Sequence, residues 1–173
     1  MKLTTLLEKV FNLIVQFFET KEGDTVDKLI KKYANKYNIP EEIVRGIINA
    51  ESNFNPNAIR YEDHYRWLVK PLDKYHYHKD TERIGQKTSW GLMQVMGAVG
   101  REKGFEGKFL SELVKPKLSL EYGCKHLHSF YKKYNDWEDA VSSYNQGSPR
   151  KTPQGEYENQ AYVDKVMNYK MKG

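Results

Sequence analysis

The hydrophobic positions along the chain recur mostly at the three- and four-residue spacing of amphipathic helices. This spacing predicts helices over six stretches: 24–37, 39–52, 91–102, 120–134, 137–144 and 161–167. Residues 61–88 break the pattern, since they are dense in Tyr, His and charge and contain Pro71 and Gly85. The pattern therefore predicts a mainly α fold, a single compact helical domain with a small irregular or β insertion at about 61–88.

The first residues of the chain carry an apolar stripe of their own. One helical face would present Leu3, Leu7, Val10, Ile14 and Phe17. We expect residues 1–22 to form an amphipathic helix and linker, and residues 23–173 to form the main domain. Polar residues interrupt the apolar run and no small-x-small cleavage site follows, so we expect neither a signal peptide nor a membrane span. Packing against the domain or a partner chain is the favoured role of this helix, and weak contact with a membrane surface is the alternative.

The composition fits a soluble globular protein with an anionic partner. The 173 residues carry a net charge of +5, from 28 Lys and Arg against 23 Asp and Glu. Nucleic acid, an anionic membrane face and the bacterial wall would all suit that charge. The chain has no compact basic run, zinc-finger spacing or RNA-binding signature, so we expect no nucleic-acid partner. Cys124 is the single cysteine, which excludes an intramolecular disulfide and favours a buried thiol.

Glu51 is the acid whose position is hardest to explain by packing. It shares one helical face with Val44, Ile47 and Ile48, because the four residues lie at i, i+3, i+4 and i+7. Burial and the negative end of the helix dipole both disfavour an ionised carboxylate there, so we expect a raised pKa. A carboxylic acid that stays protonated near neutral pH can act as a general acid. The alternatives are a surface acid, or a buried acid paired with a cation such as Arg45.

Four separated segments bear on what that acid does. In chain order they are Glu51-Ser52, Ser89-Trp90-Gly91-Leu92-Met93-Gln94, Ser143-Tyr144-Asn145-Gln146-Gly147 and Glu158-Asn159-Gln160-Ala161-Tyr162-Val163. Their order and spacing resemble the soluble lytic transglycosylase family, which shares a lysozyme-like fold with goose-type lysozyme. The resemblance covers roughly residues 24–170. It implies cleavage of the β-1,4 bond between N-acetylmuramic acid and N-acetylglucosamine in peptidoglycan.

The resemblance also implies a role for each matching residue. Glu51 matches the single catalytic acid/base, and Ser52 matches a serine that orients the acid or the substrate. The hydroxyl of Tyr162 is expected near the acid. The other implied substrate-binding residues line the glycan groove: Met93, Gln94, Tyr144 and Asn145. The implied reaction needs no metal and no cofactor, and attack of the muramic C6 hydroxyl on C1 would give a 1,6-anhydromuramoyl product.

The chain departs from the family pattern at several points. Gly97 stands where a proline is usual, Ser143 replaces an alanine, and Ser119 lies near a usual asparagine. The segment 59–65 resembles a phage-type muramidase string with an acid of its own, Glu62.

A second carboxylate facing the cleft would favour hydrolysis over anhydro-sugar formation. Glu62 is the first candidate for that carboxylate. The insertion supplies four others: Asp63, Asp73, Asp80 and Glu82.

Two further groups of side chains are candidate sites. His76 and His78 could share a strand face and bind a metal, whereas His126 and His128 on a helix would not share a face. No third ligand is evident in the sequence, so we expect no metal site. The aromatic residues of the insertion could form a sugar platform or could pack a loop that lacks other core: Tyr61, Tyr65, Trp67, Tyr75 and Tyr77.

The sequence therefore predicts a peptidoglycan-degrading lytic transglycosylase. A hydrolytic goose-type lysozyme or muramidase with a second carboxylate is the alternative of the same class. A non-catalytic cell-wall-binding or assembly protein is the alternative from another class. Since no signal peptide is expected, a phage or prophage endolysin is the favoured setting, made in the cytoplasm and acting at the cell wall or in the periplasm.

Overall fold

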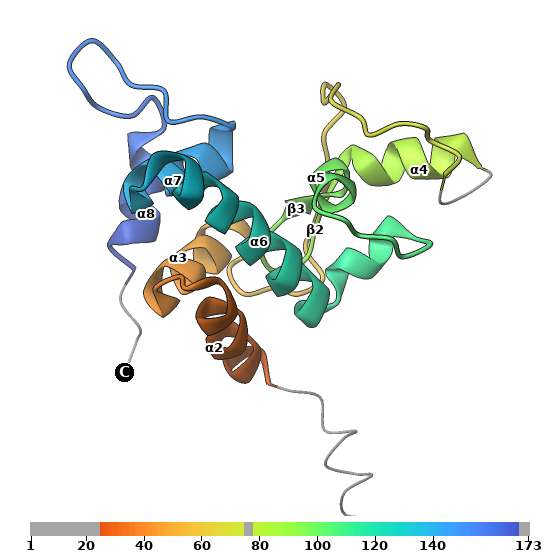
Figure 1. Ribbon diagram of the computed structural model, residues 1–173, viewed down its shortest axis with the longest axis horizontal. Helices are drawn as coiled ribbons and strands as arrows, with labels where there is room; N and C mark the ends of the chain where they lie inside the picture. Colours follow the sequence, from red (N-terminus) through yellow and green to blue (C-terminus); the bar gives the residue numbers. More distant parts are fainter. Residues whose placement is uncertain (1–24, 75–77, 170–173) are drawn as a thin grey trace, which may run out of the picture.

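The computed structural model describes residues 25–74 and 78–169. Its elements follow in the order α2 (Val26–Tyr37), α3 (Glu41–Ser52), β1 (Ile59–Tyr61), α4 (Lys79–Gln86), β2 (Thr88–Trp90), β3 (Val95–Met96), α5 (Gly97–Glu102), η1 (Leu110–Val114), α6 (Pro116–Tyr134), α7 (Trp137–Gln146) and α8 (Gln160–Met167). In Figure 1, α2, α3, α7 and α8 form one lobe, the sheet with α4 and α5 forms the other, and α6 spans between them. The mainly α, lysozyme-like fold predicted from the sequence is confirmed.

The hydrophobic core lies around α6. The stripe residues Leu120, Cys124 and Leu127 have no exposed surface, and they belong to one cluster with buried residues of α3 such as Ile47 and Ile48. Burial raises the pKa of the Cys124 thiol, which keeps it protonated. The predicted stripe of α6 and the predicted buried thiol are therefore confirmed. Within the described residues, no helix is both long enough and apolar enough to cross a membrane.

Helix α3 begins and ends close to where the sequence placed it. Pro40 stands at the N-cap, one position before the first helical residue, and Asn53 ends the helix in the left-handed conformation with a φ of 50°. A left-handed residue at this position is a common helix ending. Glu51 therefore lies in the last turn of α3, as predicted. Helix α2 has Thr25 as its N-cap rather than Asp24, which lies outside the described residues.

The predicted helix over 91–102 is wrong for its first half. Residues 91–94 form the turn of a β-hairpin between β2 and β3, and only Gly97–Glu102 is helical. Gly91 and Gln94 adopt φ values of 71° and 46°, which a right-handed helix cannot include. Strand β2 pairs antiparallel with both β1 and β3, so β1 lies at one edge of the sheet. The Gly-Leu-Met-Gln string is therefore a hairpin turn and not part of a helix.

Helix α4 is the element that the sequence did not reveal in the 61–88 insertion. Its buried residues are Glu82, Gly85 and Gln86. A helix whose buried face is polar shows no apolar stripe, so hydrophobic spacing could not detect it. The expectation of only irregular or β structure in the insertion is corrected accordingly.

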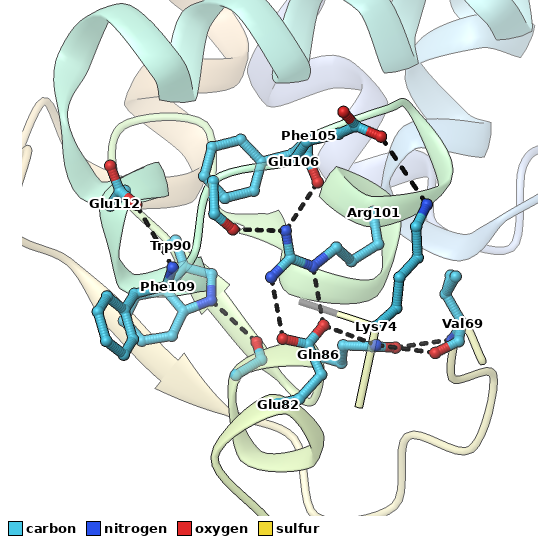
Figure 2. A network of polar contacts seen from close by, with 12 residues as sticks. Val69, Lys74, Glu82, Gln86, Trp90, Arg101, Phe105, Glu106, Phe109 and Glu112 are labelled. Atoms are coloured by element: carbon cyan, nitrogen blue, oxygen red, sulfur yellow. Dashed lines mark hydrogen bonds and ion pairs between the residues drawn. The ribbon is translucent and has the colours of Figure 1, made fainter. Parts of the chain in front are cut away.

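A buried ion pair explains how a polar helix face can pack. Figure 2 shows Arg101 reaching both carboxylate oxygens of Glu82, at 2.8 and 2.9 Å. The same guanidinium donates to the carbonyl oxygens of Phe105 and Gly107, at 2.7 and 2.8 Å. Buried charges are tolerated when such partners are present. Glu82, one of the acids considered as a second carboxylate, is therefore engaged inside the fold.

Helix α5 begins at Gly97, a position where proline is ordinarily favoured. A Cβ atom on Gly97 would lie only 2.0 Å from the carbonyl oxygen of Gly85 in α4. Any side chain there would force the two segments apart. The departure from the family's proline is therefore explained by this contact between main chains.

The main chains of helices α3 and α8 also lie in close contact. A Cβ atom on Gly46 would lie 2.3 Å from the carbonyl oxygen of Val166. Tyr162 stands one turn before Val166, and Glu51 stands five residues after Gly46. The close approach therefore lets the end of α3 meet the beginning of α8.

We predict that Gly46→Ala lowers the free energy of unfolding by roughly 1–3 kcal/mol, because the added methyl overpacks a contact between two backbones. An alanine inside a helix ordinarily stabilises by up to about 1 kcal/mol over glycine, so the clash must outweigh this gain. Chemical denaturation of the purified protein measures the change.

Gly100→Ala is the matched control for this prediction. Its Cβ would lie 2.8 Å from a methyl carbon of Leu113, which is the end of a flexible side chain. We expect a smaller effect there. Equal stability changes in the two variants would contradict the packing argument.

Candidate active site

Glu51 and Tyr162 form the central contact of the site. The Tyr162 hydroxyl donates a hydrogen bond of 2.7 Å to Glu51 Oε1. Glu51 comes from the last turn of α3 and Tyr162 from the first turn of α8, the two helices that approach at Gly46. The expected position of the Tyr162 hydroxyl, near the acid, agrees with this geometry.

Burial controls the protonation of Glu51. Removal from solvent raises the pKa of its carboxyl above the ordinary value. The hydrogen bond from Tyr162 and the positive charges of Arg60 and Lys165 oppose that rise, the negative charge of Glu62 adds to it, and burial prevails. The predicted direction of the pKa shift is therefore confirmed. Glu51 keeps its proton to a higher pH than an exposed glutamate does.

Arg45 does not neutralise Glu51. Its guanidinium donates instead to Asp27 at 2.7 Å and to Glu41 at 2.9 Å. The alternative in which Glu51 is the buried partner of Arg45 is therefore excluded.

Ser52 fastens the end of α3 to the hairpin turn. Its hydroxyl lies 2.7 Å from the carbonyl oxygen of Leu92 and 3.1 Å from that of Ile48. The hydroxyl proton is thereby directed to main-chain oxygens. Ser52 helps to place Glu51 by holding the end of its helix, and direct contact of Ser52 with a sugar stays a prediction.

Met93 has a fully buried side chain, which corrects one expectation. A side chain without exposed surface cannot line a glycan groove, and the Met93 sulfur lies 4.0 Å from that of Cys124 in the core. Its main chain serves the site instead. The Met93 N–H donates to Ser119 Oγ at 3.0 Å, and its carbonyl oxygen accepts from the Tyr144 hydroxyl at 2.7 Å. Ser119 thus holds the turn at the position where the chain departs from the family's asparagine.

Gln94 ties the same turn to the segment before β1. Its Nε2 donates to the carbonyl oxygens of Ala58 and Gly91, each at 2.9 Å. These bonds help to hold Gln94 in its left-handed backbone conformation. The contacts stabilise the turn, and binding of substrate by Gln94 stays a prediction.

Asn159 belongs to the site although the sequence analysis did not single it out. Its Nδ2 donates to Asn145 Oδ1 at 3.0 Å and to the Ser142 carbonyl at 3.1 Å, while its Oδ1 accepts from the Ser142 hydroxyl at 2.8 Å. Asn159 directly precedes α8, so these bonds join α7 to the helix that carries Tyr162. The signal was present, because Asn159 lies inside one of the four matching segments.

Asn145 is exposed, and its orientation follows from that contact. Since Asn145 Oδ1 accepts a hydrogen bond from Asn159, its Nδ2 is left as the group that can donate to a ligand. Such a donor suits the carbonyl oxygen of an N-acetyl group or a sugar hydroxyl.

Tyr144 and Tyr162 are neutral hydrogen-bond donors beside the acid. Burial raises the pKa of both phenols well above the ordinary value, and the charge of Glu51 adds to the shift. Tyr144 also packs against His126, with ring centroids 5.4 Å apart. Burial lowers the pKa of His126 to about 4, so this imidazole is neutral as well. Tyr144, Tyr162 and His126 are therefore neutral near neutral pH, and the raised pKa belongs to Glu51.

The acids of the 61–88 insertion are engaged with cations. The ion pairs are Glu62 with Arg60, Asp63 with Lys87, Asp73 with Lys79, Asp80 with Arg83, and Glu82 with Arg101. Each of these carboxylates therefore already has a cation beside it, which would compete with a water molecule for one of its oxygens.

No metal site emerges from the described residues. They include no group of three or more His, Cys, Asp and Glu side chains that could hold an ion. His76 lies outside these residues, and His78 is the N-cap of α4.

Comparison with known proteins agrees with the geometry around Glu51. The family described as the Transglycosylase SLT domain matches residues 28–166. The chain belongs to this family.

Two curated relatives show how distant the individual matches are. Protein IpgF of Shigella flexneri and Protein IpgF of Shigella sonnei are each 29% identical to the chain over 124 residues. The match covers 69% of the chain and 66% of each relative, so the chain spans just under two thirds of their length. No solved structure matches the chain significantly.

We predict that Tyr162→Phe moves the pH dependence of activity upward. The variant loses a hydrogen bond that favours ionised Glu51, so the pKa of Glu51 rises further. Activity that needs the protonated acid falls as pH rises through that pKa, and the alkaline limb of the kcat/KM profile should therefore move to higher pH. Turbidity loss of purified peptidoglycan across a pH series measures it.

Tyr134→Phe, at the end of α6, is the control for the pH profile. We expect it to leave the alkaline limb in place. A Tyr162→Phe profile whose alkaline limb is unmoved, or moved to lower pH, would show that the hydroxyl does not act on the acid.

Proposed function

We propose that this chain is a lytic transglycosylase that cleaves the β-1,4 bond between N-acetylmuramic acid and N-acetylglucosamine, with Glu51 as its only acid/base. The observation that carries the proposal is the half-buried Glu51 carboxyl, whose pKa is raised by desolvation, with the Tyr162 hydroxyl bonded to it. Family membership supports the substrate class. The environment of the acid supports the mechanism.

The first step uses protonated Glu51. Its proton passes to the glycosidic oxygen while the bond from that oxygen to C1 of the muramic acid breaks. The carboxylate that remains is stabilised by the Tyr162 hydroxyl and by the charges of Arg60 and Lys165. The groups that oppose the raised pKa in the resting enzyme therefore stabilise the ionised acid during the reaction.

The second step returns the proton. The C6 hydroxyl of the same muramic acid attacks C1 and gives its proton to the Glu51 carboxylate. A bond between C1 and O6 replaces the broken glycosidic bond, the product is a 1,6-anhydromuramoyl end, and Glu51 is protonated again. No water is consumed and no second carboxylate takes part, unlike the usual two-carboxylate pattern of glycosidases.

The residues around the acid take different parts in this scheme. Asn145 binds the sugar directly through the Nδ2 that Asn159 leaves facing outward. The hairpin turn and the end of α3 are held by Ser52, Gln94 and Tyr144. These contacts position the acid and the glycan. The side chain of Met93 takes no part in binding the glycan.

Hydrolysis with Glu62 as a second carboxylate is the alternative that one observation favours. The negative charge of Glu62 acts on the pKa of Glu51, so the two carboxyl groups lie within electrostatic reach. Glu62 is hydrogen-bonded to Arg60, however. This contact competes with the binding of an attacking water and favours the anhydro product.

The biological setting rests on residues outside the described ranges. The endolysin role, the amphipathic helix with its weak membrane contact, and the domain boundary after residue 22 remain predictions from the sequence.

We predict that purified peptidoglycan digested by this protein yields mainly 1,6-anhydromuramoyl products, which are lighter by one water than the hydrolytic products. Glu51→Gln should fold and lose roughly 100- to 10,000-fold in activity, because the amide has nearly the same shape and cannot donate the proton. Mass spectrometry of the digest and circular dichroism of the variant provide the two measurements.

Glu62→Gln is the matched variant on the other carboxylate. We expect it to keep the anhydro products as the main species. Hydrolytic products that disappear in Glu62→Gln would establish the alternative mechanism, and a folded Glu51→Gln protein with most of its activity would contradict the proposed one.

A further inference from the structure

Exposed hydrophobic side chains gather on one part of this chain. The large exposed residues of the described ranges are Ile59, Tyr61, Trp67, Ile84 and Phe109. All but Phe109 lie on β1, on α4 or on the loop 62–74 that follows β1. Trp67 is the most open of them, with 77% of its surface exposed. Single exposed hydrophobic residues are ordinary, but a tryptophan this exposed is unusual, because burial of its large apolar surface would be favourable.

The loop presents the Trp67 side chain in a fixed way. The N–H of Leu68 donates to the carbonyl oxygen of Arg66 at 3.0 Å, which closes a three-residue turn with Trp67 at its centre. The ring of Tyr65 lies 5.5 Å from the indole at an interplanar angle of 71°. Tyr65 is half-buried and supports the indole in an edge-to-face contact.

A buried clamp holds the loop on the fold, as Figure 2 shows. Gln86 Oε1 accepts from the N–H of Val69 at 2.7 Å, and Gln86 Nε2 donates to the carbonyl of Val69 at 2.9 Å. Gln86 is 1% exposed and also donates to Glu82 at 3.0 Å, the partner of Arg101. The loop is thus tied two residues beyond Trp67 to the ion pair at the centre of its lobe.

The loop begins beside the acid. The charges of Arg60 and Glu62, at the end of β1 and the start of the loop, both act on the pKa of Glu51. Trp67 stands five positions after Glu62, so their Cα atoms are at most about 18 Å apart. In Figure 1 the loop and α4 lie on the opposite lobe from α7 and α8, which carry Asn145 and Tyr162. A polymer that is held at Glu51 and runs toward this lobe would therefore come within reach of the loop.

We propose that the loop 62–74 binds the glycan strand of peptidoglycan, with a pyranose ring stacked on the indole of Trp67. The inference rests on the proposed function, since it extends the substrate of that site beyond the bond that is cleaved. The aromatic residues of the insertion were expected either to pack the loop or to bind a sugar. In this proposal Tyr65 packs the loop and Trp67 binds the sugar. Tyr75 and Tyr77 lie outside the described residues.

The chemistry of Trp67 suits the face of a sugar ring. Asp63 and Asp73, the aspartates on either side of it, are each paired with a lysine. A pyranose ring has an apolar face that matches a flat indole, and a rigid aromatic side chain loses little conformational entropy when it binds. Tyr61 is less suited, because Lys87 Nζ already lies 5.6 Å from its ring centroid.

Glycan binding can be measured separately from cleavage by placing each variant in the Glu51→Gln protein. The probe is purified glycan strands freed of peptide, with affinity measured by calorimetry. We expect Trp67→Ala to weaken binding about tenfold, as loss of a central aromatic contact does. Trp67→Phe, which keeps a smaller aromatic face, should retain part of the affinity.

Phe109→Ala is the matched control, because Phe109 is an exposed aromatic residue outside the loop, 43% exposed. It should leave the affinity for glycan unchanged, and the Trp67 and Phe109 variants should keep the parent's thermal unfolding midpoint. Gln86→Ala gives a second line of evidence, since release of the clamp should weaken glycan binding with Trp67 still in place.

Several outcomes would overturn the proposal. One is undiminished glycan binding in Trp67→Ala. Another is a loss seen only with peptide-bearing peptidoglycan or with phosphatidylglycerol vesicles, which would make the occupant a peptide or a lipid surface. If the Glu51→Gln parent cleaves glycan, or binds no glycan at all, the proposed function fails first, independently of Trp67.

Discussion

The close approach of α3 and α8 at Gly46 is the constraint on which the site depends. Only a residue without a side chain lets the Val166 carbonyl come so near. At that spacing Tyr162 can reach Glu51 across the two helices. The contact does two things at once, because it buries the acid and supplies a neutral donor for its ionised form. The packing of Gly46 against Val166 therefore helps to set the environment of the Glu51 carboxyl.

The hairpin turn 91–94 is the second fixed part, and it connects the lobes. Ser52 binds it from α3, Ser119 from α6 and Tyr144 from α7. Three helices of the core thus hold one turn of the small sheet. The sheet in turn carries β1 and the loop after it. The position of that loop relative to Glu51 therefore depends on bonds made to main-chain atoms of the turn, which a sequence motif cannot display.

Two signals in the sequence were informative: the spacing of hydrophobic residues, and one acid on an otherwise apolar helix face. The long helices and Glu51 follow from these signals, and the family resemblance supplied Tyr162. The sequence could not reveal α4, because its buried face is polar and finds its partners only in the folded chain. It also assigned Met93 to the groove, since a motif does not show whether a side chain points into the core. The sequence does not show the role of Asn159, because that role is to join α7 to α8 by hydrogen bonds that form only in the folded chain.

Direct titration of the Glu51 carboxyl tests the central claim, that burial raises its pKa although the hydrogen bond from Tyr162 and the charges of Arg60 and Lys165 oppose the rise. Carbon-13 NMR of the carboxyl carbons gives the pKa, and the resonance missing in Glu51→Gln identifies the residue. The account predicts a pKa for Glu51 clearly above that of an exposed glutamate, about 4.3. A value at or below 4.3 would mean that Glu51 is ionised in the resting enzyme and cannot be the general acid proposed here.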